Sequence, residues 1–163
     1  MPFDFVFRDA IVVDGTGANR FVADVAVEGD RIAEFGTVTS SALIEIDAAG
    51  LVLAPGFIDV HTHDDFALET SPDMAFKTLQ GVTTIVTGNC GTSVPGFPGW
   101  MEARTKSPSA VNVAPLIGHG TIREAVMGRS TNRHAKADEL AAMRDEVSRA
   151  FDAGAIGMST GLV

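Results

Sequence analysis

The sequence has few of the features that tie a protein to a membrane, an oxidising compartment or a nucleic acid. Its single cysteine, Cys90, excludes an internal disulfide framework and fits a reducing compartment. No apolar run approaches the roughly 20 residues that a membrane helix needs. With 12 basic against 21 acidic residues the formal net charge is −9, so phosphate backbones repel the chain. These features, and a start without the basic and apolar regions of a signal peptide, predict a soluble cytoplasmic protein that binds neither nucleic acid nor membrane.

The rest of the composition is that of a globular chain of 163 residues, 45% of them hydrophobic. Over residues 1–54, period-2 apolar spacing interrupted by Gly and Asp turns predicts a small antiparallel β-domain with sandwich-like strands. Over residues 55–163, apolar strands alternate with helical stretches, which predicts parallel βα units. We expect the strands of this second region at 56–63, 83–90, 111–120 and 155–163.

Two helices are expected between these strands. The first covers 71–81, with Ser71 as N-cap. The second covers 138–154, and its buried face is marked by apolar residues three or four positions apart, namely Leu140, Met143, Val147 and Phe151. Residues 91–110 are rich in Gly, Pro and Ser and are interpreted mostly as loop.

The pair His61 and His63 stands at the end of the first expected parallel strand. Residues i and i+2 of a strand point to the same side, so both imidazoles can approach one metal ion. On its own, the His-x-His pattern also fits two polar residues beside a loop. Asp59 shares their face and fits two roles, a hydrogen bond that orients an imidazole or a buried ion pair.

Cys90 ends the next expected strand, at the same edge of the sheet as the two histidines. A lone cysteine is often an inert apolar residue, but a strand end is where functional residues gather. Histidine nitrogen together with thiolate sulfur suits zinc. The sequence therefore predicts a zinc site made by His61, His63 and Cys90.

The runs APGFIDVHTHDD (54–65) and GVTTIVTGNCG (81–91) resemble the D-aminoacylase branch of the amidohydrolase superfamily, the N-acyl-D-amino-acid deacylases. The stretches 110–128 and 154–163 resemble it too, so the likeness covers almost the whole chain. Most relatives bridge their metals with a carboxylated lysine of the fourth strand, whereas this branch uses a cysteine of the second. The expected fourth strand, AIGMSTGLV, has no lysine, which agrees with the branch.

The resemblance implies the N-terminal half of a TIM-like (βα)₈ barrel behind the small β-domain, with Zn²⁺ held by His61, His63 and Cys90. It implies hydrolysis of the amide of an N-acyl-D-amino acid by a metal-bound hydroxide. A full barrel takes about 250 residues, so we expect the chain to be truncated. The acid–base aspartate of the family is expected beyond Val163, and the chain alone is expected to be inactive.

Several further points stay open from the sequence. His119, at the end of the third expected strand, could line the pocket or be a structural histidine, and Ser159 could contact substrate. The chain could also be a non-catalytic half-barrel that binds metal or a partner chain, or another amidohydrolase such as a dihydroorotase or hydantoinase. Open barrel edges predict possible self-association.

Overall fold

A computed structural model describes residues 2–129 and 132–161 of the chain. The chain divides into two compact units, Met1–Pro55 and Gly56–Val163. Among the described residues, no helix is both long enough and apolar enough to cross a membrane.

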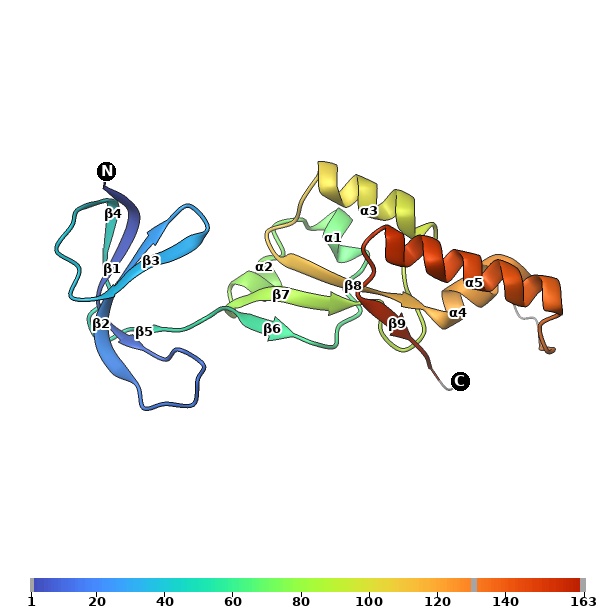
Figure 1. Ribbon diagram of the computed structural model, residues 1–163, viewed down its shortest axis with the longest axis horizontal. Helices are drawn as coiled ribbons and strands as arrows, with labels where there is room; N and C mark the ends of the chain where they lie inside the picture. Colours follow the sequence, from blue (N-terminus) through green and yellow to red (C-terminus); the bar gives the residue numbers. More distant parts are fainter. Residues whose placement is uncertain (1, 130–131, 162–163) are drawn as a thin grey trace. The chain divides into compact units, whose positions relative to one another are not determined.

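The first unit is built on one five-stranded sheet (Figure 1). β1 (Phe3–Val12), β2 (Phe21–Glu28) and β3 (Arg31–Gly36) form antiparallel pairs in chain order, as the period-2 spacing predicts. β4 (Ala42–Asp47) and β5 (Val52–Leu53) pair with β1 in parallel, which spacing cannot predict because it carries no strand direction. The sandwich-like expectation is corrected, because the described residues of this unit form a single sheet.

The core of the first unit is small. Val6, Ala26 and Val38 form its buried cluster. Beside this cluster, the Arg8 guanidinium lies 3.1 Å from both Asp24 and Glu45 and also donates to the Val38 carbonyl. Large apolar side chains stay exposed, among them Ile32, Phe35 and Leu43.

The second unit carries a parallel sheet in the order β6 (Phe57–Asp59), β7 (Val82–Thr87), β8 (Asn112–Gly118) and β9 (Gly157–Ser159). Its strands are shorter than the sequence predicts. β6 ends at Asp59 because the Asp59 carboxylate accepts the His61 backbone N–H at 3.2 Å, which forms an Asx turn. His61 and His63 therefore lie in the loop after the strand. Residues 162–163 of the expected fourth strand lie outside the described residues.

Five helices are found among the described residues of this unit. They are α1 (Ala67–Thr70), α2 (Ala75–Thr78), α3 (Phe97–Lys106), α4 (His119–Met127) and α5 (Ala137–Asp152). α1, α3 and α5 lie on one side of the sheet (Figure 1). Apolar side chains of these helices, of α4 and of the sheet pack into one core, which includes Leu68, Ile85, Phe97, Trp100, Ile122 and Met143.

The helices correct three expectations. Segment 71–81 is not one helix, since Ser71 is the C-cap of α1 and only Ala75–Thr78 is helical. The expected loop 91–110 contains α3, which tolerates a proline because the proline lies in its first turn. In α5, Met143 is buried as expected, but Leu140 and Phe151 are each 46% exposed.

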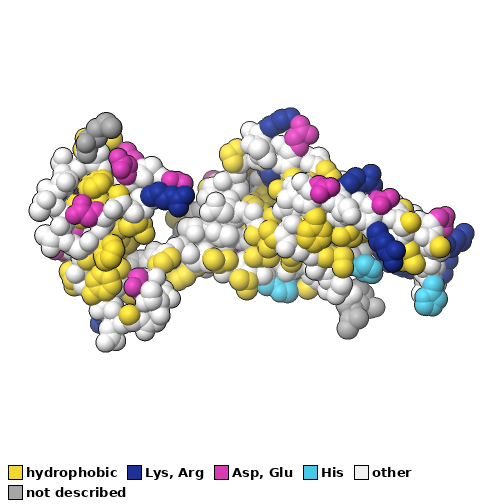
Figure 2. Space-filling view, in the orientation of Figure 1, with side chains coloured by type: hydrophobic (Ala, Val, Ile, Leu, Met, Phe, Trp, Pro, Cys, Tyr) yellow, Lys and Arg dark blue, Asp and Glu magenta, His cyan; other side chains and the backbone are white. Residues whose placement is uncertain are grey.

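The edge strands of the parallel sheet, β6 and β9, keep large apolar side chains exposed. Phe57 and Ile58 of β6 are 61% and 62% exposed, and Met158 of β9 is 47% exposed. Figure 2 shows hydrophobic side chains over this part of the second unit, with histidine side chains beside them. Both edges are thus apolar as well as unpaired within the described sheet.

Candidate metal centre

The ligand atoms of His61, His63 and Cys90 all lie within 4.8 Å of one another. Cys90 Sγ is 3.4 Å from His61 Nε2, and the two imidazole centroids are 5.6 Å apart. In tetrahedral zinc, Zn–N bonds of about 2.0 Å and Zn–S bonds of about 2.3 Å separate two nitrogens by about 3.3 Å and a nitrogen from the sulfur by about 3.5 Å. The Cys90–His61 pair has this separation, and small side-chain rotations would bring all three donors to one ion. In the described parts of the chain, no other His, Cys, Asp or Glu side chains form a group of this kind.

The loop after β6 presents both histidines on one side. Thr62, between them, is buried, and its N–H donates to the Val86 carbonyl at 3.3 Å. The Asn89 side chain donates to the Thr62 carbonyl at 3.1 Å. Because Thr62 points inward, its two neighbours point outward, and both imidazoles are exposed. The alternation expected of a strand thus persists beyond the last strand residue.

Lys77 of α2 lies between two carboxylates that flank the histidines. Its Nζ is 2.6 Å from Asp59 Oδ2 and 2.9 Å from Asp64 Oδ2, and its side chain is only 16% exposed. The Lys77 hydrogen bond and the His61 N–H hold the pKa of Asp59 below its ordinary value. Asp59 and then Asp64 raise the pKa of Lys77. Of the two roles open to Asp59, the structure shows the ion pair, since its oxygens contact Lys77 and backbone instead of an imidazole.

Asp65 follows in the same loop and is 7% exposed. Burial raises the pKa of its carboxyl, because desolvation penalises the charged form.

Cys90 lies in a tight turn after β7, with a left-handed backbone at φ 54°. Ser159, the last residue of β9, accepts the Gly91 N–H at 2.9 Å and donates to the Gly88 carbonyl. The Asn89 side chain also donates to the Val86 carbonyl at 2.8 Å. The turn is thus held from both sides, and Ser159 acts here as a support for the Cys90 turn.

Neighbouring backbone packs directly against this turn. A Cβ atom on Gly118 would lie 2.5 Å from the Gly91 carbonyl oxygen, and one on Gly161 would lie 2.3 Å from the Cys90 carbonyl oxygen. Real Cβ atoms do not come this close to backbone, so only glycine fits at either place. The ends of β8 and β9 therefore fix the position of the thiol.

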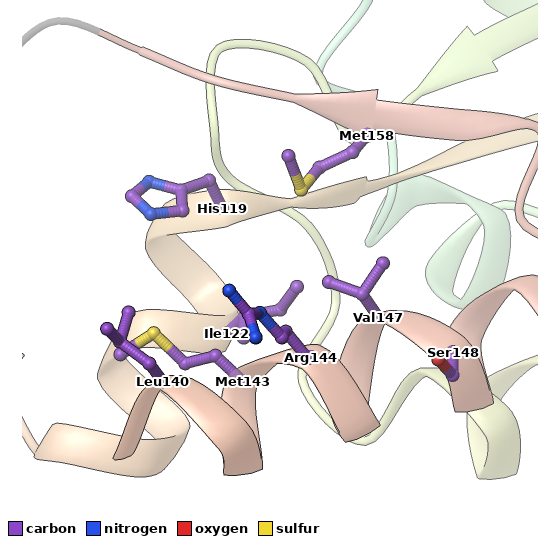
Figure 3. Close-up of a pocket in the computed structure, with 8 residues that line it drawn as sticks. All are labelled: His119, Ile122, Leu140, Met143, Arg144, Val147, Ser148 and Met158. Atoms are coloured by element: carbon purple, nitrogen blue, oxygen red, sulfur yellow. The ribbon is translucent and has the colours of Figure 1, made fainter. Parts of the chain in front are cut away.

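His119 is not brought to the cluster. It is the first residue of α4, it is exposed, and it lines a hollow of about 410 Å³ between α4, α5 and β9 (Figure 3). The other lining residues are mostly apolar and include Met143, Val147 and Met158. Of the two roles left open for His119, the structure therefore shows a histidine that lines this hollow and is not one of the three grouped donors.

Sequence reasoning missed Lys77 and interpreted Ser159 differently. The one available signal for Lys77 was a lone cation in the otherwise apolar run MAFKTL, a setting in which a buried ammonium needs a partner. Nothing in the sequence identifies that partner, because the ion pairs join residues 13 and 18 positions apart.

The parallel βα sheet carries a His-x-His pair after its first strand and a thiol after its second, a set of donors that suits a metal ion. The family model described as "Amidohydrolase family" matches residues 45–162, so the chain belongs to the amidohydrolase family. Two curated relatives come from Alcaligenes xylosoxydans xylosoxydans. The chain is 41% identical to its D-aminoacylase, covering 98% of this chain, and 43% identical to its N-acyl-D-aspartate deacylase, covering 97% of this chain.

A solved relative shares the fold closely. It is the N-acyl-D-glutamate deacylase of Bordetella bronchiseptica, complexed with zinc and a phosphonate that mimics the tetrahedral intermediate. The TM-score is 0.92 at 39% identity over 99% of this chain. The chain spans 38% and 36% of the two curated relatives and 39% of the solved one. The architecture is thus that of a D-aminoacylase over this part of its length.

Proposed function

We propose that this chain is the metal-binding N-terminal part of a zinc hydrolase that cleaves the amide of N-acyl-D-amino acids to a carboxylate and a D-amino acid. The observation that carries the proposal is the convergence of His61, His63 and Cys90 at the ends of β6 and β7. The likeness to three deacylases of D-amino-acid derivatives supports the substrate class.

Two neutral imidazoles and one thiolate form a donor set that suits zinc better than the hard cations, which prefer oxygen. A zinc ion held there would polarise the amide carbonyl and lower the pKa of a water to about 7. The residues of this chain hold the donors in place, with Asn89 and Ser159 supporting the thiol. All three donors are exposed, so their open side is accessible to a substrate.

The alternative of another amidohydrolase, such as a hydantoinase or dihydroorotase, is disfavoured by the donor set. Cys90 supplies a thiol where those relatives rely on a lysine of the fourth strand, and Ala155–Gly161 has no lysine. The alternative of a non-catalytic half-barrel predicts the same metal binding and differs only in turnover.

A chimera tests the proposal. Residues 1–163 replace the aligned segment of the Alcaligenes D-aminoacylase, and the zinc-loaded chimera is assayed on N-acetyl-D-amino acids and their L-enantiomers. We expect hydrolysis of the D-substrates that is lost in the Cys90→Ala chimera. A folded chimera that binds zinc but cleaves no N-acyl-D-amino acid contradicts the proposed activity.

The isolated chain is the matched comparison. We expect it to bind zinc without measurable turnover, since the acid–base aspartate is expected beyond Val163 and acid–base catalysis alone supplies about 10²–10⁴-fold. The cytoplasmic location and the self-association through the β6 and β9 edges also stay predictions. Sedimentation at micromolar concentration tests the second.

A further inference from the structure

We infer that Lys77 is a positioning residue of the metal centre: its ammonium holds the loop that carries His61 and His63, so that both imidazoles face the Cys90 thiol. The inference rests on the proposed function in one respect, namely that the three donors bind a metal ion.

The ion pairs of Lys77 bracket the two histidines. Asp59 lies two residues before His61, and Asp64 follows His63 directly, so one ammonium fixes both ends of the loop. The other oxygen of Asp59 accepts the His61 backbone N–H at 3.2 Å. A displacement of Lys77 would therefore move the Asp59 carboxylate and, with it, the backbone of His61, a candidate metal ligand.

Every N–H of the Lys77 ammonium has a partner. Besides the two carboxylates, Nζ lies 3.4 Å from Thr62 Oγ1, and that hydroxyl also donates to Asp64. A lysine ammonium has three donors, and here all three are directed at residues 59–64. A single cation thus organises the whole turn beneath the imidazoles.

The backbone of Lys77 is held next to the core of the second unit. Met74, just before α2, is completely buried in the core, with a left-handed backbone at φ 47°. The Lys77 N–H donates to the Met74 carbonyl at 2.8 Å. The ammonium is thus anchored to the core, so it can impose a position on the loop.

Positioning and simple charge predict opposite effects of removing Lys77. By Coulomb's law alone, loss of the Lys77 charge leaves the negative charges of Asp59 and Asp64 uncompensated, which strengthens the binding of a metal cation. By positioning, the same loss frees the loop and weakens binding. Because His61, His63 and Cys90 are exposed, water screens the Coulomb effect, and we expect positioning to dominate.

The test compares zinc affinity, measured by competition with a chromophoric chelator, and the Co²⁺ absorption spectrum in three variants of the full 163-residue chain. Lys77→Met should weaken zinc binding by about 10–100-fold, the usual cost of losing a group that orients a metal ligand. It should also shift the Co²⁺ d–d bands. Lys77→Arg, which keeps the charge and both ion pairs, should restore most of the affinity.

Lys106→Met is the matched control, because Lys106 pairs with Glu102 on the exposed surface of α3 in the same unit. It should bind zinc like the original chain. Should Lys77→Met fail to fold by circular dichroism, Asp64→Asn removes one of the two ion pairs and should give a smaller loss of affinity.

Zinc affinity of Lys77→Met that is unchanged or higher overturns the inference while the proposed function stands. An original chain that binds Co²⁺ without a thiolate charge-transfer band removes the proposed function and the inference with it.

Discussion

Each of the two units holds one basic side chain between two carboxylates, yet only one of these arrangements lies beside residues that can bind a metal. In the first unit, Arg8 pairs with Asp24 and Glu45, each at 3.1 Å. In the second, Lys77 pairs with Asp59 at 2.6 Å and with Asp64 at 2.9 Å. The basic side chains are similarly covered, at 24% and 16% exposure.

The difference lies in what the carboxylates hold. Asp24 accepts the backbone N–H groups of Asp9 and Val38, so it fixes an irregularity of β1 and the turn after β3. Asp59 accepts the N–H of His61, a candidate ligand. A cation between carboxylates is thus a general device for fixing backbone, and its role in function depends on the neighbouring side chain.

The largest expected effect concerns the donors. His63→Ala or Cys90→Ala should weaken zinc binding by roughly 10²–10³-fold, because four-ligand zinc sites bind with about 10–16 kcal/mol in all. Isothermal titration of each variant measures this loss. Hydrogen exchange should show zinc protecting amides of the second unit only. Protection of amides in the first unit would contradict the difference between the two units. Unchanged zinc affinity in Cys90→Ala would contradict the role of the thiol.

Packing behind the thiol gives the next effect. Gly118→Ala should destabilise the second unit by about 1–3 kcal/mol, since its new Cβ meets backbone at Gly91 and Ser93. Gly99→Ala in α3 is the control, because its Cβ meets nothing within 4 Å and a helical alanine gains about 0.5–1 kcal/mol. Denaturant unfolding measures both. Equal behaviour of the two variants means that the close contact with Gly91 is not formed.

Substitution of Arg8 tests the corresponding ion pairs of the first unit. Arg8→Met should increase hydrogen exchange in β1 and β4, because Asp24 and Glu45 lose their partner. It should leave the zinc affinity unchanged. A loss of zinc affinity in Arg8→Met would show that the two units do not behave separately.

The smallest expected effect is a pH dependence in α5. Arg133 donates to Glu139, which also accepts the Lys136 N–H, and both contacts lower the pKa of Glu139 from 4.5 to about 2. A folded-state pKa below the unfolded value contributes stability that is complete above pH 4.5 and lost as the pH falls to about 2. Glu139→Gln should flatten acid unfolding of the second unit in this window. An unchanged slope contradicts the pairing.

The proximity of the three candidate donors could be predicted from the sequence. His61, His63 and Cys90 were placed together because the carboxyl ends of neighbouring parallel strands share one edge of a sheet. That argument holds although β6 ends at Asp59, since buried Thr62 keeps the alternation. The helix α3 could not be predicted, because its Gly and Pro residues are typical of loops and only packing of Phe97 and Trp100 fixes it.

The contacts that support the donors could not be predicted. Lys77, Ser159 and Gly118 act through contacts with residues distant in sequence, and nothing in the sequence identifies those partners. The parallel pairing of β4 with β1 is of the same kind, since apolar spacing reports which face is buried and not which way a strand runs.

X-ray absorption at the zinc edge of the zinc-loaded chain tests the metal centre most directly. His61, His63 and Cys90 predict one sulfur at about 2.3 Å and two imidazole nitrogens at about 2.0 Å from the ion. The sulfur shell should vanish in Cys90→Ser. A spectrum of the original chain with nitrogen and oxygen neighbours only would contradict the site.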